Sequence, residues 1–296
     1  MKALLIYALI IVSFSSFSQN NIVLIKDFGR NRGMLKMYSY TPANLDSSKV
    51  FPLVVVLHGC TQTARTAVNA TDWNKLADSL NFMVIYPEQR QINNVSKCFN
   101  FFIGFKAKKG KGEVASIKQM IDYTIEHNNI DTSRIFITGM SAGGGMSNAM
   151  LNAYPKLFNA GALLEAPSTM VADFSTDNIQ PRVLIVQGEK DKVVRKINGE
   201  KLVKQWCEKY KTNIKDFKLT ENIDGNSLLT TKTYYKNNKP VIIYLFAKTV
   251  GHKLLINPGS DIKHGGRNGI HTKNIGFFST YFIADFWGLV PKKIQH

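Results

Sequence analysis

The sequence contains no internal repeat, no Gly/Ser-rich or Pro-rich linker, and, beyond its first residues, no apolar run that approaches a membrane span. These absences argue against a repeat protein, a chain of linked domains and a membrane-embedded protein. Its 296 residues are 44% hydrophobic and 20% charged, as in an ordinary globular protein with a sizeable core. We therefore expect one catalytic domain over residues 19–296.

Motifs that bind metals or nucleotides are also missing. There is no C-x-x-C, no H-E-x-x-H and no Gly-rich phosphate loop followed by lysine. We therefore expect neither a metal ion nor a cofactor.

Acidic residues are scarce, with 21 Asp and Glu against 38 Lys and Arg, so the formal net charge is +17. Nucleic acid would be the obvious partner of such a charge. However, the lysines are scattered singly and in pairs, and no basic stretch carries interleaved aromatic residues. The densest patch, Lys106–Lys111, has the composition of a loop. We expect a solvated basic surface that favours acidic polymers, no nucleic-acid partner and a monomeric protein.

The N-terminus has the pattern of a secretory signal. Lys2 precedes a short apolar run, Ala3–Val12, and small residues at Ser16 and Ser18 suit cleavage after Ser18. The alternative is a membrane anchor, but so short a run spans a bilayer about 30 Å thick poorly. We expect a signal peptide at residues 1–18 and a secreted or periplasmic mature protein that is not bound to a membrane.

Only three cysteines are present, Cys60, Cys98 and Cys207. Export would permit disulfides, and an odd count leaves either one free thiol or an intermolecular bridge. Cys60 and Cys98 both flank the candidate site described below, whereas Cys207 lies in a segment with a helical pattern. We predict a Cys60–Cys98 disulfide and a buried, free Cys207.

Short apolar, β-branched runs alternate with helical patterns along the chain. This alternation predicts an α/β fold, with a mostly parallel central sheet and helices on both faces. Ligands bind such sheets at the carboxyl ends of the strands. The predicted strands are 53–57, 82–86, 135–138, 183–186 and 241–246, and the predicted helices are 72–80, 113–127, 142–154 and 277–287.

The strand at 135–138 is followed by Gly139-Met140-Ser141-Ala142-Gly143, a G-x-S-x-G sequence that opens a helix. A strand-to-helix turn this sharp strains the serine backbone and leaves no space for neighbouring β-carbons, so the hydroxyl stands exposed at the helix N-terminus. The pattern also arises by chance, and its position between a strand and a helix makes it specific. We predict that Ser141 is a nucleophile.

A serine nucleophile needs a base that a third group orients, and hydrolases with this turn have the chain order Ser, Asp or Glu, His. The loop after strand 183–186 offers Asp191, with Glu189 as the alternative acid. The loop after strand 241–246 offers His252 as the base, and Gly251 would let that loop turn tightly. Five other histidines have weaker positions: His58, His127, His264, His271 and His296.

The tetrahedral intermediate of such a reaction needs two backbone N–H donors for its oxyanion. We predict these at Ala142, directly after the nucleophile, and at Cys60, in the loop after strand 53–57. A Cys60–Cys98 disulfide would hold that loop in place.

With these residues in place, the chain resembles the polyhydroxybutyrate (PHB) depolymerase family of secreted esterases, which also contains feruloyl and acetylxylan esterases. The resemblance runs from about Phe51 to Leu289. It implies the α/β-hydrolase fold and ester hydrolysis through an acyl-enzyme, with Ser141, Asp191 and His252 as the triad and Cys60 at the oxyanion position. The matching segments are 57–64, 73–78, 86–89, 97–102, 112–117, 138–144, 251–252 and 286–289.

Two segments depart from the family pattern and leave the substrate open. Gln187 stands where the family usually has histidine, and the residues after His252 are larger than usual. The matching core ends near Leu289, so we expect no separate polymer-binding domain. The predicted substrates are hydroxyalkanoate oligomers or feruloyl and acetyl esters of plant polysaccharides. An acyltransferase of the same fold and a non-catalytic polysaccharide-binding protein are the alternatives.

The substrate pocket is the least defined part of the site. Phe99, Phe101 and Phe102 follow Cys98 and could line an acyl or aryl pocket, although they fit a hydrophobic core equally well. We also assign His58, Glu88 and Gln89 to the pocket.

Overall fold

A computed structural model describes residues 21–46, 48–104, 107–168 and 180–291. The predicted signal peptide therefore lies outside the described residues. The central feature is a ten-stranded sheet with the order β1-β2-β4-β3-β5-β6-β7-β10-β9-β8, and a small parallel pair, β11-β12, lies apart from it. The strands are β1 Val23–Ile25, β2 Lys36–Tyr40, β3 Phe51–Leu57, β4 Met83–Glu88, β5 Ile130–Met140, β6 Ala160–Leu164, β7 Arg182–Gly188, β8 Lys218–Ile223, β9 Asn226–Lys236, β10 Lys239–Ala247, β11 Leu254–Ile256 and β12 Thr272–Asn274.

The strands in the middle of the sheet, from β4 to β10, pair in parallel, and antiparallel pairs form its two edges. Strands β3 and β4 are buried along their whole length, as expected of apolar strands that are covered on both faces. The predicted α/β fold with a mostly parallel sheet is confirmed. All five predicted strands are present, while β1, β2, β6, β8, β9, β11 and β12 were not predicted.

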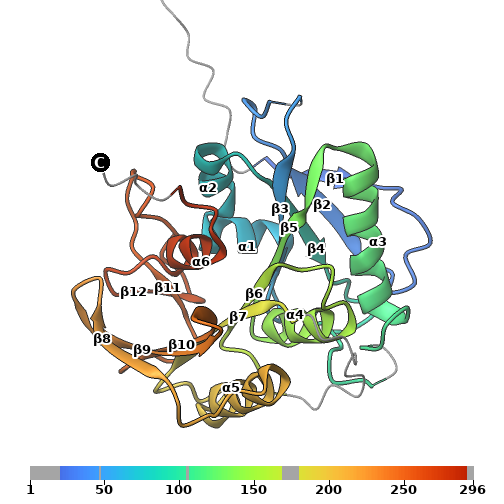
Figure 1. The fold of residues 1–296 in the computed structure, drawn as a ribbon. Helices are drawn as coiled ribbons and strands as arrows, with labels where there is room; N and C mark the ends of the chain where they lie inside the picture. Colours follow the sequence, from blue (N-terminus) through green and yellow to red (C-terminus); the bar gives the residue numbers. More distant parts are fainter. Residues whose placement is uncertain (1–20, 47, 105–106, 169–179, 292–296) are drawn as a thin grey trace, which may run out of the picture.

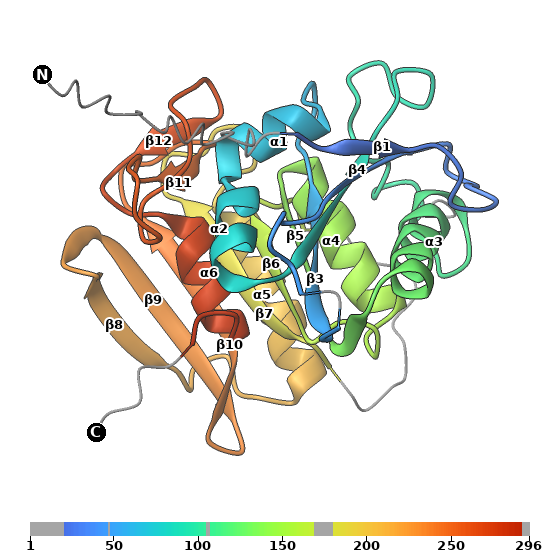
Figure 2. The ribbon, with the colours of Figure 1, turned by 90° about the horizontal axis from the view of Figure 1, so that it is seen from above.

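Helices cover both faces of this sheet (Figures 1 and 2). Helices α3, α4 and α5 pack with one hydrophobic cluster, while α1, α2 and α6 pack with a second cluster on the opposite face. Their bounds are α1 Ala64–Thr71, α2 Trp73–Leu80, α3 Gly112–His127, α4 Ala142–Ala153, α5 Ile197–Tyr210 and α6 Ser279–Trp287. Among the described residues, no helix is long and apolar enough to cross a membrane.

Strand order places the candidate residues at one edge. From β3 the chain passes through α1 and α2 to β4 on one side, and it then returns through α3 to β5 on the other side of β3. Such a reversal opens a crevice at the carboxyl ends of the two inner strands. The loop after β3 and the turn after β5 therefore meet there.

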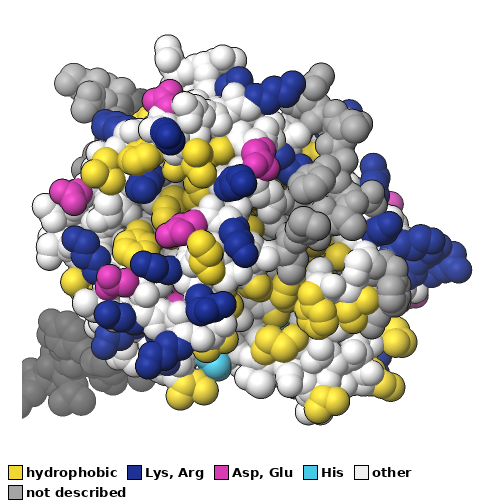
Figure 3. Space-filling model, turned by 90° about the horizontal axis from the view of Figure 1, so that it is seen from below, with side chains coloured by type: hydrophobic (Ala, Val, Ile, Leu, Met, Phe, Trp, Pro, Cys, Tyr) yellow, Lys and Arg dark blue, Asp and Glu magenta, His cyan; other side chains and the backbone are white. Residues whose placement is uncertain are grey.

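Basic side chains do not form a single stripe on the face of the molecule drawn in Figure 3. On the face drawn in Figure 3, Lys and Arg side chains are dispersed among hydrophobic and uncharged ones over much of the area, with a denser group at one edge. This dispersion resembles a solvated charged surface more than a nucleic-acid groove.

Candidate active site

Ser141 stands between β5 and α4 in a strained backbone conformation. Its φ of 55° and ψ of −120° are unusual for a residue with a side chain. Two backbone hydrogen bonds stabilise this conformation. The Ser141 N–H donates to the Leu164 carbonyl at the end of β6 (2.9 Å), and the Ser141 carbonyl accepts from the Gly145 N–H (2.9 Å). The turn therefore presents residue 141 at the carboxyl edge of the sheet.

The two glycines of the G-x-S-x-G sequence lie so close to neighbouring backbone atoms that no other residue fits. A β-carbon on Gly139 would lie 2.4 Å from the Gly143 carbonyl carbon, and one on Gly143 would lie 2.4 Å from the Leu57 carbonyl oxygen. These distances are far below van der Waals contact, so only glycine fits at either position. The first turn of α4 thus lies directly against the end of β3.

Asp191 lies in the loop after β7, with a fully buried side chain. One carboxylate oxygen accepts from the N–H groups of Val193 and Val194 (2.8 Å each), and the other faces Nδ1 of His252 at 2.6 Å. Burial alone would raise the pKa of Asp191. The hydrogen bonds with His252, Glu165 and the Val194 N–H outweigh that effect and lower this pKa below its usual value. Asp191 is therefore an anion aimed at the imidazole.

The Asp191 loop and the His252 loop are clasped together by backbone contacts. The Lys190 N–H donates to the Val250 carbonyl (2.7 Å), and the Thr249 N–H donates to the Glu189 carboxylate (2.9 Å). A β-carbon on Gly188 would lie 2.6 Å from the Val250 carbonyl oxygen, so the loops approach as closely as glycine permits. Glu189, the alternative acid, thus contacts the backbone of the His252 loop, and no hydrogen bond among the described residues joins it to the imidazole.

The expectation that Gly251 is needed for a tight turn is wrong. Its backbone is not left-handed, and a β-carbon there would meet nothing closer than the Lys190 carbonyl oxygen at 3.7 Å. Thr249 takes up the left-handed conformation in this loop, with a φ of 62°.

The bond to Asp191 fixes the proton of His252. Because Nδ1 donates to the carboxylate, the neutral ring leaves Nε2 free to accept a proton. The structure thus brings Asp191 and His252 together. In the part of the chain that the structure describes, the Ser141 hydroxyl forms no hydrogen bond with this ring, and catalytic hydrogen bonds often tighten only when substrate binds.

The loop His58–Gln62 follows β3 and is rigidly held. Its Gly59 N–H donates to the Gln62 side chain (2.8 Å), its Thr61 N–H donates to the Ser96 carbonyl (2.6 Å), and Cys60 forms a disulfide with Cys98. Among the described residues, the Cys60 N–H has no hydrogen-bond partner. Ala142 opens α4, so its N–H has no acceptor within the helix. Neither of the N–H groups predicted to hold the oxyanion is therefore engaged by an acceptor among the described residues. Cys207 is free and buried, as predicted.

Four of the six side chains assigned to the pocket are buried. His58 donates from Nδ1 to the Gly59 carbonyl (2.7 Å) and accepts at Nε2 from the Gln89 N–H (3.0 Å), and burial lowers its pKa. Glu88 accepts from the Ala64 N–H, and Phe99 packs against the His58 ring. In this conformation His58, Glu88, Gln89 and Phe99 support the loops and do not face solvent.

Phe101 and Phe102 are the two assigned pocket residues that reach the surface. Phe101 is partly buried and lies so close to Gly145 that a β-carbon there would meet its ring at 2.7 Å. Phe102 is 56% exposed and meets Phe101 edge to face. The Phe101 ring therefore lies beside the first turn of α4, and the Phe102 ring packs against it.

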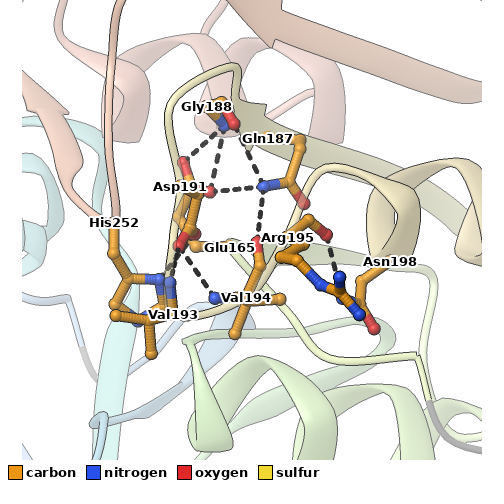
Figure 4. A network of polar contacts seen from close by, with 9 residues as sticks. All are labelled: Glu165, Gln187, Gly188, Asp191, Val193, Val194, Arg195, Asn198 and His252. Carbon is orange, nitrogen blue, oxygen red and sulfur yellow. Dashed lines mark hydrogen bonds and ion pairs between the residues drawn. The ribbon is translucent and has the colours of Figure 1, made fainter.

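A second carboxyl group, Glu165, lies behind Asp191 and was not predicted. It follows β6, whose Ala-Gly-Ala start lacks the β-branched residues that identify the other strands. One oxygen or nitrogen of each of Glu165, Asp191 and His252 lies within 4.8 Å of the others, which is a spacing that could also hold a metal ion. Hydrogen bonds already engage these atoms (Figure 4).

The remaining histidines have other contacts. His264 pairs with Asp261 (2.7 Å) on the surface, and His127 stacks on Tyr123 at the end of α3. Burial lowers the pKa of His271, and the electrostatic effects of Lys253 and His252 lower it further. His296 lies outside the described residues.

The chain is similar to several known depolymerases and esterases. Residues 36–174 match the model of the family described as esterase PHB depolymerase. Over 98% of its length the chain is 31% identical to poly(3-hydroxyalkanoate) depolymerase C of Paucimonas lemoignei and covers 75% of that protein. It is 26% identical to feruloyl esterase B of Thermothelomyces thermophilus, over 79% of this chain and 88% of that one.

Among solved structures, an acetyl xylan esterase from Aspergillus awamori superimposes with a TM-score of 0.74 at 22% identity. The match covers 91% of this chain and 100% of that one. The predicted α/β-hydrolase fold is therefore confirmed.

Proposed function

Because the chain belongs to the PHB depolymerase family of carboxylic ester hydrolases, we propose that it hydrolyses esters through an acyl-enzyme on Ser141, with His252 as base and Asp191 as the acid that orients it. The observation that carries this proposal is the 2.6 Å contact from Asp191 to Nδ1 of His252, at the sheet edge where Ser141 stands in a strained turn. The contact leaves Nε2 as the proton acceptor.

Each catalytic step uses one of these groups. Ser141 Oγ attacks the ester carbonyl while His252 Nε2 takes its proton, and the N–H groups of Cys60 and Ala142 stabilise the oxyanion. Collapse of the intermediate expels the alcohol, which receives the proton from His252. Water, activated by the same imidazole, then hydrolyses the acyl-enzyme.

We assign the substrate to hydroxyalkanoate oligomers or to feruloyl and acetyl esters of plant polysaccharides. The named activities of the relatives support this range, and the paired rings of Phe101 and Phe102 offer an apolar surface at the first turn of α4, which Ser141 precedes. Export as a secreted or periplasmic protein, with residues 1–18 removed, completes the assignment.

The decisive experiment compares Ser141→Ala with wild type on p-nitrophenyl acetate and methyl ferulate. We expect kcat to fall about 10⁴-fold or more. Ser147→Ala is the matched control, since it removes a buried hydroxyl from the same helix that bonds only the Gly143 carbonyl. An unchanged rate in Ser141→Ala would remove this residue from the mechanism. A burst of alcohol followed by slow turnover in water would instead indicate an acyltransferase, and absence of any turnover a binding protein.

A further inference from the structure

Glu165 is a fully buried carboxyl group at the carboxyl end of β6, the strand between those that carry Ser141 and Asp191. Its backbone is left-handed, with a φ of 46°. A non-glycine residue is held in this conformation only where the surroundings fix it, and such residues gather at functional sites. The strain at Glu165 directs its side chain towards the Asp191 loop.

The carboxyl group of Glu165 is held by hydrogen bonds from Gly188 and Gln187 and lies close to Asp191 (Figure 4). The Gly188 N–H donates to both of its oxygens (2.9 and 3.0 Å), and the Gln187 side-chain amide donates to Oε2 (3.0 Å). The same amide nitrogen donates to the Val194 carbonyl (3.0 Å), which fixes which way the amide of Gln187 faces. The third neighbour is the Asp191 carboxyl group, since one ligand atom of each side chain lies within 4.8 Å of the other.

Two buried carboxyl groups in contact cannot both be ionised without a cation. Among the described residues, no Lys or Arg forms an ion pair with either group. The titratable groups that face Glu165 are Asp191, His252 and, from β10, the Tyr244 hydroxyl. Asp191 receives two backbone N–H bonds and the imidazole, which stabilise its anion. Burial raises the pKa of Glu165 well above its usual value, and although the Gly188 N–H lowers it, the contact with Asp191 raises it further.

We propose that Glu165 is a positioning residue that stays protonated and donates a hydrogen bond to Asp191, which in turn orients His252. This inference rests on the proposed function, because it assigns a role relative to the Ser141, His252 and Asp191 triad. Glu165 does not touch the substrate. It fixes the Asp191 carboxylate in addition to the imidazole and the two backbone N–H groups, and it reduces the electron density that Asp191 offers to His252. Groups that orient metal-ligating histidines through a hydrogen bond contribute about 10- to 100-fold to activity, and we expect an effect of the same order from Glu165.

The test compares Glu165→Gln and Glu165→Ala in the full protein, by kcat, KM and the pH profile of kcat/KM on p-nitrophenyl acetate. Glu165→Gln keeps a neutral donor and acceptor, so we expect kcat within about threefold and an unmoved acidic limb. Glu165→Ala removes the donor. We expect kcat to fall about 10- to 100-fold with KM nearly unchanged, and the acidic limb to move to higher pH because Asp191 then holds the imidazolium more strongly. Glu208→Gln, an exposed carboxylate on α5, is the control.

An acidic limb that moves to lower pH in Glu165→Gln would overturn the proposal, since it would show that a negative charge had been removed. Wild-type kcat and pH profile in both variants would overturn it as well. Failure of the proposed function is recognised separately, because Ser141→Ala would then keep wild-type activity whatever the Glu165 variants do.

A spectroscopic measurement keeps the proposal testable if Glu165→Ala does not fold. The infrared difference between wild type and Glu165→Gln at neutral pH is expected to contain the carbonyl stretch of a neutral carboxylic acid. Its absence would show that Glu165 is ionised and would overturn the proposal.

Discussion

Asp191 and Glu189 lie two residues apart in one loop, and the sequence leaves both open as the acid of the triad. Their partners in the structure differ. Asp191 meets the imidazole at 2.6 Å, whereas Glu189 accepts from the backbone of Thr249. The difference arises from the path of the loop, which turns one carboxylate inward and the other outward.

We expect Asp191→Asn to lower kcat about 10³- to 10⁴-fold, because an amide cannot stabilise the imidazolium and favours the wrong tautomer of His252. Glu189→Gln should retain kcat within about threefold, since its amide oxygen still accepts from Thr249. Steady-state kinetics on p-nitrophenyl acetate measure both. The reverse ranking would transfer the role to Glu189.

Glu165 also links activity to stability at the residue scale. Because its proton is bound more tightly in the folded than in the unfolded protein, the folded state holds more protons above the usual Glu pKa. Stability from this group is therefore complete at low pH and declines as pH rises. The free energy of unfolding of Glu165→Gln, relative to wild type, should increase with pH by up to about 1.4 kcal/mol per pH unit. Urea unfolding at several pH values, from about pH 4 to about pH 8, measures this difference. A constant difference would contradict the buried, protonated state.

At the scale of elements, the turn between β5 and α4 depends on backbone approach. The first turn of α4 lies against the end of β3, and the glycines at 139 and 143 permit this contact. The geometry of the oxyanion donors follows from it, because the loop His58–Gln62 begins where α4 touches β3.

Gly143→Ala is expected to abolish activity and to lower the free energy of unfolding by about 3 kcal/mol or more. Its β-carbon would overlap the Leu57 carbonyl oxygen. Gly251→Ala should be tolerated, since its β-carbon would make only an ordinary van der Waals contact with the Lys190 carbonyl oxygen. Thermal unfolding and kcat of the two variants provide the comparison. Wild-type behaviour of Gly143→Ala would show that α4 can move away from β3.

The disulfide joins the loop after β3 to the segment after β4, across 38 residues. In the chain-entropy model, a disulfide that closes a loop of this length restricts the unfolded chain and so stabilises the fold by about 4 kcal/mol. We expect the double variant Cys60→Ser, Cys98→Ser to lose stability of this order and to show reduced kcat, because the Cys60 N–H would no longer be fixed. Cys207→Ser alone tests the free thiol. A double variant with unaltered kcat would separate the disulfide from oxyanion stabilisation.

At the scale of the whole molecule, the formal net charge is +17, and the proposed catalytic residues do not account for it. Charges spread over the surface attract anionic ligands at long range, and salt screens this attraction, with a Debye length of about 10 Å at 0.1 M.

For an ester that carries a free carboxylate, such as a short hydroxybutyrate oligomer, we expect KM to rise severalfold between low and high salt. For a neutral ester such as methyl ferulate, KM should stay nearly constant. Kinetics at about 0.02 and 0.5 M NaCl test this, and equal salt dependence of both substrates would remove the basic surface from substrate capture.

Local patterns in the sequence by themselves determined much of this protein. Alternating apolar runs and helical periods predict the parallel sheet, and G-x-S-x-G between a strand and a helix predicts the turn at Ser141. The order of serine, acid and histidine along the chain then narrows the acid to Asp191 or Glu189 and favours His252 as the base. These features were predictable because each depends on neighbouring residues and on the rule that parallel strands end at the same edge.

Only the tertiary structure decided the surroundings of these residues. Strand β6 has small residues that pack beneath Leu151, so its character depends on its neighbours in the sheet and not on its own composition. Glu165 at its end becomes a partner of Asp191 because β6 and β7 lie side by side. Likewise, His58 and Gln89 were assigned to the substrate pocket from their positions in the sequence. In the structure both are buried and form hydrogen bonds that support a loop. The burial and protonation of these side chains depend on contacts between segments that are far apart in the sequence. No single segment therefore predicts them.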